Sequence, residues 1–257
     1  MRLEGRRVIV TGGARGIGEA CVRAFVNEGA RVVSLDVLDP SGRRVTTEAD
    51  GAGPGSATYL HCDIADRSEV DAAFEQAVSW LGGLDVLANV AGVERRSAAT
   101  DITDEEWDLV LNVNVKGTLH TNQAAYRSMQ AGGGAILNFG SDAGLGPYPN
   151  GAHYSASKGA VMAWTRTAAV EWAPRGITVN SVVPAIWTPM YDEYRARLPA
   201  DELALHDAGM RARVPLGGRL GDPTHDLAPV MVFLASEDAH FITGQIISIN
   251  GGIGMVR

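Results

Sequence analysis

The sequence predicts an α/β fold in which about seven parallel strands form one doubly wound sheet with helices on both faces. Three observations support this prediction. Short apolar runs alternate with longer segments of helical periodicity along the chain. The first apolar run leads directly into a glycine-rich turn. No linker-like stretch divides the 257 residues, so we expect residues 1–257 to form a single domain.

The first unit consists of a strand, a glycine-rich loop and a helix. The strand at residues 8–10 leads into the loop at residues 11–18, and apolar residues then recur at helical spacing as far as Gly29. Glycines let backbone N–H groups approach a pyrophosphate, and the first turn of a helix offers unpaired donors. The second strand, residues 31–35, ends at Asp36, whose carboxylate can accept both hydroxyls of an adenosine ribose. We therefore expect a Rossmann-type sheet that binds NAD in preference to NADP.

The third strand begins after a segment without chemistry of its own. Residues 39–56 are rich in Gly, Pro, Ser and charge, which indicates a solvated helix or loop. The strand at residues 57–63 ends at Asp63, on the edge of the sheet where ligands bind. Asp66 and Glu69 have the spacing of a capping box, and an apolar helical stripe follows them.

The fourth strand leads into Asn89-Val90-Ala91-Gly92, where small side chains would let the backbone approach a ligand. A long helix then begins at Thr103 or Asp104. Asn112 and Asn114 lie inside this helix, although Asn is a poor residue for a helix interior. The pair indicates either solvent exposure or a site that needs a side-chain amide or a freed carbonyl, and we expect exposure.

The apolar run at residues 135–139 predicts a buried strand with Ser141 at its carboxyl end, and the next helix carries Tyr154 and Lys158. Residues four apart on a helix share a face. A neighbouring ammonium favours phenolate and lowers the tyrosine pKa from about 10, so Tyr154 could exchange protons with an alcohol or a carbonyl. The Tyr-x-x-x-Lys spacing alone is a weak signal, and Ser141 at the ligand edge strengthens it. We expect His153 to be a helix-start or surface residue.

The last part of the chain contains two more strands, at residues 177–183 and 246–249. Between them, residues 185–215 form an irregular segment with aromatic and charged residues, which suits a lid that covers the substrate. A further helix begins at Pro223. We expect Pro229 to kink that helix, because an internal proline removes a backbone hydrogen bond.

Composition excludes several other classes of protein. The net charge of −8, with Arg residues scattered among acids, argues against a nucleic-acid partner. Cys21 and Cys62 provide neither a disulfide framework nor a spaced set of metal ligands, and they suit a reducing compartment. The N-terminal residues leave no room for a signal peptide, and no run reaches the roughly 18 apolar residues of a membrane span. We expect a cytoplasmic protein with no metal site and no membrane partner.

Together these motifs resemble the single-domain branch of the short-chain dehydrogenase/reductase family, over residues 8–252. The chain departs from the family pattern at Val90, where the family has a second Asn, and after Pro184, where the segment to Thr188 is one residue shorter than usual. The resemblance implies a catalytic tetrad of Asn114, Ser141, Tyr154 and Lys158. The cofactor-binding residues that it implies are Gly12, Arg15, Gly16, Ile17, Gly18, Asp36, Asp63, Ile64, Asn89, Ala91, Gly92, Tyr154, Lys158, Pro184, Ile186 and Thr188.

The family further implies an NAD-dependent oxidoreductase that acts on a secondary alcohol or ketone and assembles as a homotetramer. In that reaction Tyr154 would be the acid or base, and Lys158 would lower its pKa and bind the nicotinamide ribose. Ser141 would orient the substrate oxygen, while Asn114 would hold a water linking Lys158 to solvent.

Two other functions compete with this one. A non-catalytic dinucleotide-binding or sensing protein would have no need of the tetrad. A sugar epimerase or dehydratase uses a related Tyr and Lys pair, usually with a longer C-terminal substrate domain. The candidate substrate-pocket residues mix polar and aromatic groups that could suit a polyol, a hydroxy acid or a ring alcohol; they are Glu94, Arg95, Asp142, Pro147, Tyr148, Asn150, His153, Trp187 and Tyr191.

Overall fold

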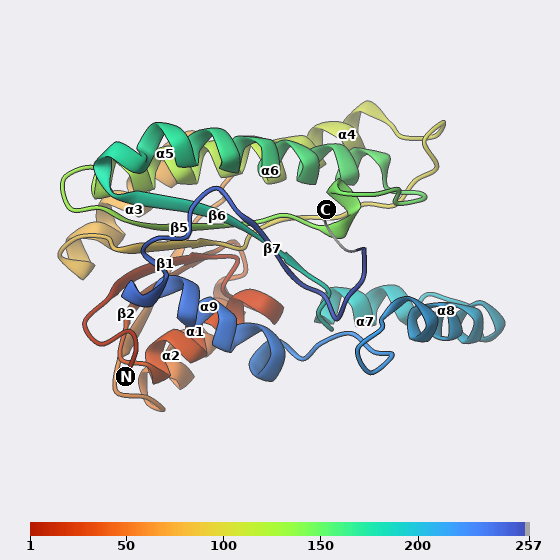
Figure 1. Ribbon diagram of the computed structural model, residues 1–257, viewed down its shortest axis with the longest axis horizontal. Helices are drawn as coiled ribbons and strands as arrows, with labels where there is room; N and C mark the ends of the chain where they lie inside the picture. Colours follow the sequence, from red (N-terminus) through yellow and green to blue (C-terminus); the bar gives the residue numbers. More distant parts are fainter. Residues whose placement is uncertain (255–257) are drawn as a thin grey trace.

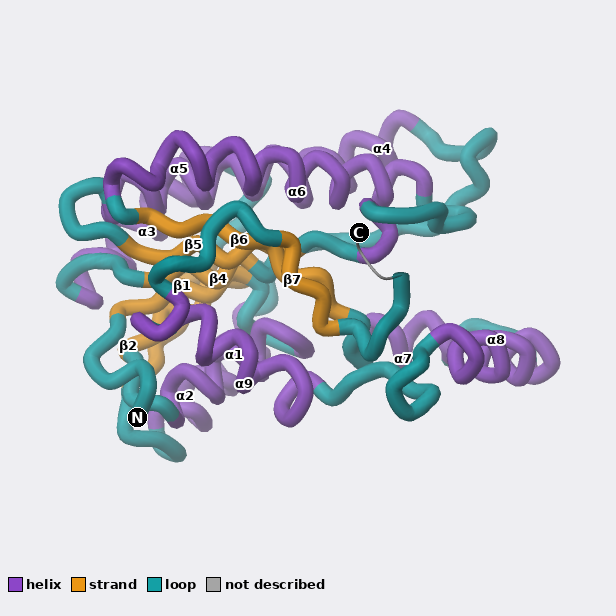
Figure 2. The backbone as a smooth tube through the Cα atoms, viewed as in Figure 1, coloured by secondary structure: helices purple, strands orange, loops and turns teal. Residues whose placement is uncertain are grey.

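The computed structural model, which describes residues 1–254, contains one seven-stranded parallel sheet between two layers of helices (Figures 1 and 2). The strand order is β3-β2-β1-β4-β5-β6-β7. The order reverses between β1 and β4, and their carboxyl ends diverge into the crevice where such sheets bind ligands. The predicted fold class is confirmed. The strands are β1 (Arg7–Thr11), β2 (Arg31–Asp36), β3 (Ser56–His61), β4 (Val86–Asn89), β5 (Gly134–Phe139), β6 (Ile177–Pro184) and β7 (Ile246–Ile249).

Three helices cover each face of the sheet (Figure 1). On one face lie α1 (Gly16–Asn27), α2 (Asp39–Asp50) and α9 (Ala228–Ala235). On the other lie α3 (Arg67–Leu81), α5 (Gly117–Met129) and α6 (Ala152–Trp172), with α4 (Asp104–Leu111) packed beside α6. Within residues 1–254, no helix has both the length and the apolar character needed to cross a membrane.

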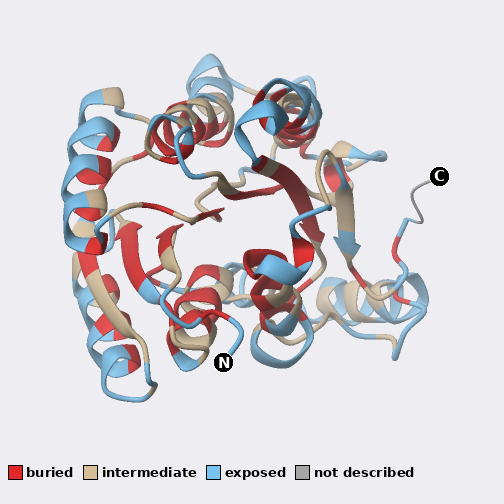
Figure 3. Ribbon diagram, turned by 60° about the vertical axis from the view of Figure 1, so that its left-hand side comes forward, coloured by how far each residue is buried: buried red, intermediate tan, exposed pale blue. Residues whose placement is uncertain are grey.

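The core consists of two apolar clusters, one on each face of the sheet. In β1, the side chains of Val8 and Val10 enter the cluster beneath α1, whereas Ile9 enters the cluster beneath α3. Phe25 from α1 and Phe74 from α3 fill the two clusters. Figure 3 shows central strands that are buried along most of their length. Because successive residues of these strands face opposite sides and both sides are covered, their sequences are apolar runs rather than alternating ones.

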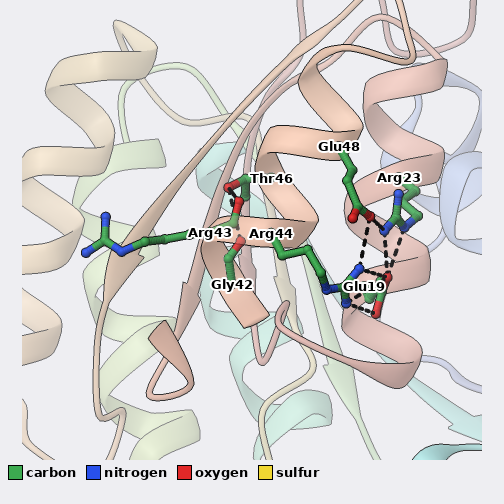
Figure 4. A network of polar contacts seen from close by, with 7 residues as sticks. All are labelled: Glu19, Arg23, Gly42, Arg43, Arg44, Thr46 and Glu48. Carbon is green, nitrogen blue, oxygen red and sulfur yellow. Dashed lines mark hydrogen bonds and ion pairs between the residues drawn. The ribbon is translucent and has the colours of Figure 1, made fainter. Parts of the chain in front are cut away.

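Helix α2 is joined to α1 by a network of ion pairs (Figure 4). The Glu19 carboxylate accepts from Arg23 at 2.7 Å and from Arg44 at 3.3 Å. Glu48 accepts from the same two arginines at 2.6 and 2.9 Å. Partly exposed pairs of this kind contribute little one by one, but the network links the helix that follows Asp36 to the helix that follows the glycine-rich loop. The solvated helix or loop expected at residues 39–56 is therefore a helix for most of its length.

The segment expected to be irregular contains two helices, so that expectation is wrong. They are α7 (Pro189–Arg195) and α8 (Ala200–Arg213), and they extend beyond the carboxyl edge of the sheet (Figure 1). Thr188 caps α7 by accepting from the Tyr191 N–H at 3.3 Å, and Pro189 occupies the first turn. This Thr-Pro signal was present in the sequence. No residue of either helix is buried in the described structure, so an apolar stripe could not reveal them.

Two other helical stretches contain a π-helical turn, which the sequence analysis did not anticipate. The helix from Thr103 is interrupted by a π-helical turn at Asn112–Lys116. Asn112 is exposed as expected, but Asn114 is only 1% exposed, so the expectation for Asn114 is wrong. The helix that begins at Pro223 is also irregular: Pro223–Leu227 is π-helical, and α9 continues from Ala228 with Pro229 in its first turn. A proline cannot donate to the preceding turn, so the irregular turn lies where the internal proline was expected to disturb the helix.

The capping box predicted for α3 is half right. The Asp66 carboxylate accepts from the backbone N–H groups of Ser68 and Glu69, as a helix cap should. The Glu69 carboxylate, however, accepts from the backbone N–H of Asp63 at 2.8 Å rather than from that of Asp66. Glu69 thus holds the end of the third strand in place of closing the box.

A buried amide network ties β4 and β5 to the helices above them. The Asn138 side chain is fully buried; its oxygen accepts from Asn122 at 2.9 Å and from Asn89 at 3.3 Å. Its nitrogen donates to Asn122 at 2.9 Å and to Thr165 at 3.1 Å. Every polar atom of this amide is therefore paired inside the core.

We expect Asn138→Ala to lower the free energy of unfolding by about 2–4 kcal/mol, because several buried partners would lose hydrogen bonds with no water to replace them. Urea denaturation at a fixed protein concentration measures the change. Asn27→Ala, which removes an exposed amide at the end of α1, is the matched control and should stay within about 0.5 kcal/mol of wild type. Equal midpoints for the two variants would show that the network does not stabilise the fold.

Candidate active site

The glycine-rich loop lies at the carboxyl end of β1 and packs against the segment after β4. Gly12 has a φ of +69°, and a Cβ at this position would lie 2.8 Å from the Cα of Ala91. The Ala91 N–H donates to the Thr11 hydroxyl at 3.1 Å. Among the described residues no side chain caps α1 at Arg15, so the N–H groups of its first turn are free of side-chain acceptors. The loop thus has both the close backbone packing and the donors that a pyrophosphate needs.

Asp36 lies at the end of β2, as predicted, and faces the loop. Its carboxylate accepts from the Ala14 N–H at 3.0 Å and from the Leu38 N–H at 3.1 Å. Asp36 is followed directly by Val37 and Leu38, but the parallel register places His61 of β3 opposite it. The His61 ring lies 2.6 Å from the Asp39 carboxylate, which holds the pKa of His61 above its usual value.

Asn89 braces the sheet through its side-chain amide. Its amide oxygen accepts from the hydroxyls of Thr11 and Thr121, at 3.0 and 2.9 Å. Its amide nitrogen donates to Thr118 and Asn138, at 3.1 and 3.3 Å. The side chain is only 2% exposed and fully engaged, so any ligand contact of Asn89 must come from its backbone.

Of the other residues that the resemblance implies to bind the cofactor, some lie at the crevice and some have side chains in the core. Gly92 lies beside the tetrad, because a Cβ there would be 3.1 Å from Asn114 Oδ1 and 3.4 Å from Lys158 Nζ. Asp63 accepts from the Ala65 N–H at 2.9 Å. The buried side chains of Ile64 and Ile186 belong to the two core clusters, which leaves only their backbone groups for a ligand.

Tyr154 and Lys158 lie near the start of α6, and Ser141 follows β5. Lys158 is buried, and its ammonium donates to the Phe139 carbonyl at 2.9 Å, with Nζ 5.7 Å from the centre of the Tyr154 ring. Ser141 caps the short 3-10 turn Asp142–Gly144, and its hydroxyl is close enough to Tyr154 to lower the tyrosine pKa through a hydrogen bond. The structure therefore brings these three predicted residues together.

Asn114 joins the same group through its amide. The side-chain oxygen accepts from the Val93 N–H at 2.8 Å, and the nitrogen donates to the Val93 carbonyl at 2.9 Å and to the Ser157 hydroxyl at 3.0 Å. Ser157 in turn donates to the Tyr154 carbonyl at 2.8 Å. The π-helical turn directs Asn114 inward, where it fixes the loop after Gly92 against α6. Turns of this kind are frequent at functional sites.

The ionisation of Tyr154 differs from expectation. Burial raises its pKa above the usual value of about 10, and the Glu94 charge raises it further, whereas Ser141 and Arg96 lower it. Burial also lowers the pKa of Lys158 to about 8. The expected net lowering of the Tyr154 pKa is wrong, because loss of hydration and the Glu94 charge together outweigh the Ser141 hydrogen bond and the Arg96 charge. The sequence could not show that Lys158 is buried and Tyr154 partly buried.

The mouth of the site is formed by residues from three segments. The Glu94 carboxylate accepts from the Tyr148 hydroxyl at 2.8 Å and from Arg96 at 2.9 Å. The Arg96 guanidinium lies between the rings of Tyr148 and Tyr194, 4.7 and 4.5 Å from their centres. The Tyr148 ring is 6.0 Å from that of Tyr154. Sequence reasoning missed Arg96 and Tyr194, since only the fold places α7 beside the loop after Gly92.

The remaining pocket candidates have mixed outcomes. His153 begins α6 as expected but is fully buried, so the surface alternative is wrong; neither ring nitrogen has a hydrogen-bond partner within residues 1–254. Arg95 is exposed, and its side chain donates to the adjacent Glu94 carbonyl. Asp142 accepts from Asn250 at 2.9 Å. Trp187 donates to Asp192 at 2.8 Å and packs edge-on against Tyr191, so both aromatic residues stabilise the start of α7.

Comparison with known proteins agrees with this geometry. The family model described as enoyl-(acyl carrier protein) reductase matches residues 12–254. The chain is 38% identical to the 3-oxoacyl-(acyl-carrier-protein) reductase FabG of Thermotoga maritima, over 98% of this chain and 99% of the relative. It is 36% identical to a 3-alpha-(or 20-beta)-hydroxysteroid dehydrogenase of Mycobacterium bovis, over 98% and 90%.

Solved structures lead to the same family. A short-chain type dehydrogenase/reductase from Mycobacterium marinum superposes with a TM-score of 0.88 at 33% identity, covering 99% of this chain and 97% of that one. Levodione reductase superposes with a TM-score of 0.92 at 27% identity, covering 98% of each chain. The chain belongs to the short-chain dehydrogenase/reductase family, and it is an oxidoreductase that interconverts alcohols and ketones with a nicotinamide dinucleotide.

Proposed function

We propose that this enzyme transfers a hydride between NAD(H) and a secondary alcohol or ketone, with Tyr154 as the group that exchanges the proton. The observation that carries the proposal is the meeting of Tyr154, Lys158 and Ser141 beside Gly92, at the carboxyl edge of the sheet. This is the edge where open α/β sheets place ligands.

The crevice has the groups that a nicotinamide dinucleotide needs. The backbone of Gly12, Arg15, Gly16, Ile17 and Gly18 would hold the pyrophosphate, and Asp36 would accept the adenosine ribose hydroxyls. The adenine would contact Asp63 and Ile64, and the middle of the cofactor would cross the backbone of Asn89, Ala91 and Gly92. Lys158 and Tyr154 would bind the nicotinamide ribose, and Pro184, Ile186 and Thr188 the nicotinamide amide. When bound, the nicotinamide ring supplies the acceptor or donor of the hydride.

In the oxidation direction, the protein moves one proton. Ser141 would orient the substrate hydroxyl, and the Tyr154 phenolate would remove the hydroxyl proton as the carbinol carbon loses its hydride. With a pKa of about 8, Lys158 is mostly protonated at pH 7, so its positive charge would favour the phenolate form of Tyr154. Asn114 would hold a water that passes the proton from Lys158 to solvent.

A spectrophotometric screen tests this function. Purified enzyme with NAD⁺ should form NADH, followed by its absorbance, with at least one class of secondary alcohol. Binding of NAD⁺ without turnover across a broad panel of alcohols and ketones would favour a sensing protein instead. Conversion of a sugar with no release of free NADH would favour an epimerase or dehydratase.

The pH dependence of oxidation should follow the charges at the mouth. Because Tyr154 must lose its proton and its pKa is raised, the oxidation rate should increase as pH rises above neutral. Glu94→Gln removes a charge that raises this pKa, so the rise should move to lower pH, by roughly half a unit. Arg96→Gln should move it to higher pH. Arg95→Gln, next to both, is the control, and profiles of kcat/KM that coincide for all three variants would contradict this role.

We also propose that the chain assembles as a homotetramer. A groove of about 350 Å³ runs between α4, α5 and α6 and is lined mainly by apolar side chains, among them Leu111, Val115, Leu119, Val161 and Trp164. Before the last strand, Phe241 is 94% exposed. Apolar surface of this kind usually marks an interface. Light scattering should give about four times the chain mass of 27.1 kDa, and a mass near 27.1 kDa would refute assembly.

A further inference from the structure

We call residues 185–215, which we expect to cover the substrate, the covering segment. A carboxylate of this segment forms an ion pair with the one basic side chain of the glycine-rich loop. Arg15 is the only Lys or Arg within residues 11–18. Its Nη1 lies 2.8 Å from the Glu193 carboxylate of α7. Both side chains are about half exposed, at 45% and 52%, so the ion pair is not a consequence of burial. The pair forms because the backbone places α7 beside the loop.

The start of α7 lies directly against the loop. A Cβ at Gly16 would be 3.3 Å from Pro189 Cδ and 3.8 Å from Thr188 Cβ. Arg15 precedes the first turn of α1 in an extended conformation, with a φ of −158°. Glu193 follows Pro189 by one helical turn, which brings its carboxylate back over the loop. The ion pair therefore joins the covering segment to the loop expected to bind the pyrophosphate.

The charges around the loop favour a ribose with free hydroxyls. Asp36 accepts from the N–H of Ala14, the residue next to Arg15, so one carboxylate already faces this part of the crevice. Arg15 is the group that could attract a 2′-phosphate, and Glu193 neutralises it. His61, opposite Asp36, is held by Asp39. Asp36, Arg15 and Glu193 together carry a net charge of −1, which opposes the additional negative charge of NADP.

We propose that Glu193 is a specificity-determining residue of the cofactor site: it occupies Arg15 and so adds to Asp36 in selecting NAD over NADP. The inference rests on the proposed binding of a nicotinamide dinucleotide at this loop. It assigns to the covering segment a role in choosing the cofactor, in addition to enclosing the substrate. Because α7 contacts the loop through this pair, the selection depends on the position of α7 beside Arg15.

Glu193→Gln tests the inference by binding alone. Isothermal titration with NAD⁺ and with NADP⁺, in the absence of substrate, gives both dissociation constants. The variant should bind NADP⁺ about fivefold more tightly than wild type, the size expected when an exposed ion pair is lost, and NAD⁺ within about twofold. In an Arg15→Ala background, Glu193→Gln should have no effect on either dissociation constant, because the guanidinium for which Glu193 and the 2′-phosphate compete is absent.

Glu202→Gln provides the matched control, since it removes the same charge from an exposed position on α8. An equal gain in NADP⁺ affinity for Glu202→Gln and Glu193→Gln would show that only the net charge of the protein matters, and would overturn the proposal. The proposal would also be overturned if Glu193→Gln left the ratio of the NAD⁺ and NADP⁺ dissociation constants unchanged, or if its gain in NADP⁺ affinity persisted in the Arg15→Ala background. If the wild-type enzyme binds neither dinucleotide, the proposed cofactor site itself is wrong; if it binds NAD⁺ and only the Glu193 effect is missing, this inference alone fails.

Discussion

Replacing Tyr154 with Phe should lower kcat by about a thousandfold while the dissociation constant for NADH stays within a few-fold of wild type. General acid–base catalysis contributes roughly 10²- to 10⁴-fold, and this change removes only the oxygen that carries the proton. The aromatic ring, its packing beside Tyr148 and the bond from Lys158 to the Phe139 carbonyl all remain. Steady-state kinetics and fluorescence titration with NADH measure the two quantities.

Two further variants provide a control and a comparison for Tyr154→Phe. Tyr126→Phe removes a hydroxyl from a tyrosine whose ring packs against Trp172, away from the tetrad, and should leave both quantities unchanged. Lys158→Met should weaken turnover and cofactor binding together, because Lys158 would serve both. If Tyr154→Phe kept substantial activity at saturating substrate, Tyr154 would not be the proton-exchanging group.

The second large effect concerns the cofactor. Wild-type enzyme should use NAD with a kcat/KM about a hundredfold above that for NADP, because Asp36 would face the 2′-phosphate as a like charge that costs several kcal/mol. Asp36→Ala should lose most of this preference, and the gain should appear in KM for NADP. The carboxylate is well placed for this effect, since the Ala14 and Leu38 N–H groups hold it toward the loop.

A control separates this effect from a general change in charge. Asp201→Ala removes an exposed acid from the first turn of α8 and should leave the cofactor ratio unaltered. A wild-type enzyme that prefers NADP would contradict our interpretation of Asp36, and would direct attention to Arg15 and to His61 across the strand pair.

The sheet and most of the tetrad could be predicted because their signals are local. Strands such as β1 and β5 are covered on both faces, which makes them apolar runs that end in glycine or in a polar residue at the carboxyl edge. The Tyr154 and Lys158 spacing also depends only on the helix period. The family resemblance added the roles and the placement of Asn114.

What could not be predicted depends on contacts between distant segments. Arg96 gains its place between Tyr148 and Tyr194 only when three segments meet. Asn114 is buried because a π-helical turn directs it toward Val93. The raised pKa of Tyr154 likewise reflects its burial, a quantity that residue types and spacing do not contain.

Deuterium transfer tests the central claim most directly. With a responsive secondary alcohol labelled at the carbinol carbon, one deuterium should pass to C4 of the nicotinamide for each ketone formed, and mass spectrometry of the released NADH should show it. The Tyr154→Phe variant should show almost no transfer in the same time. NADH without deuterium, or a label that returns to the carbon substrate with no NADH released, would contradict direct hydride transfer between the alcohol and the cofactor.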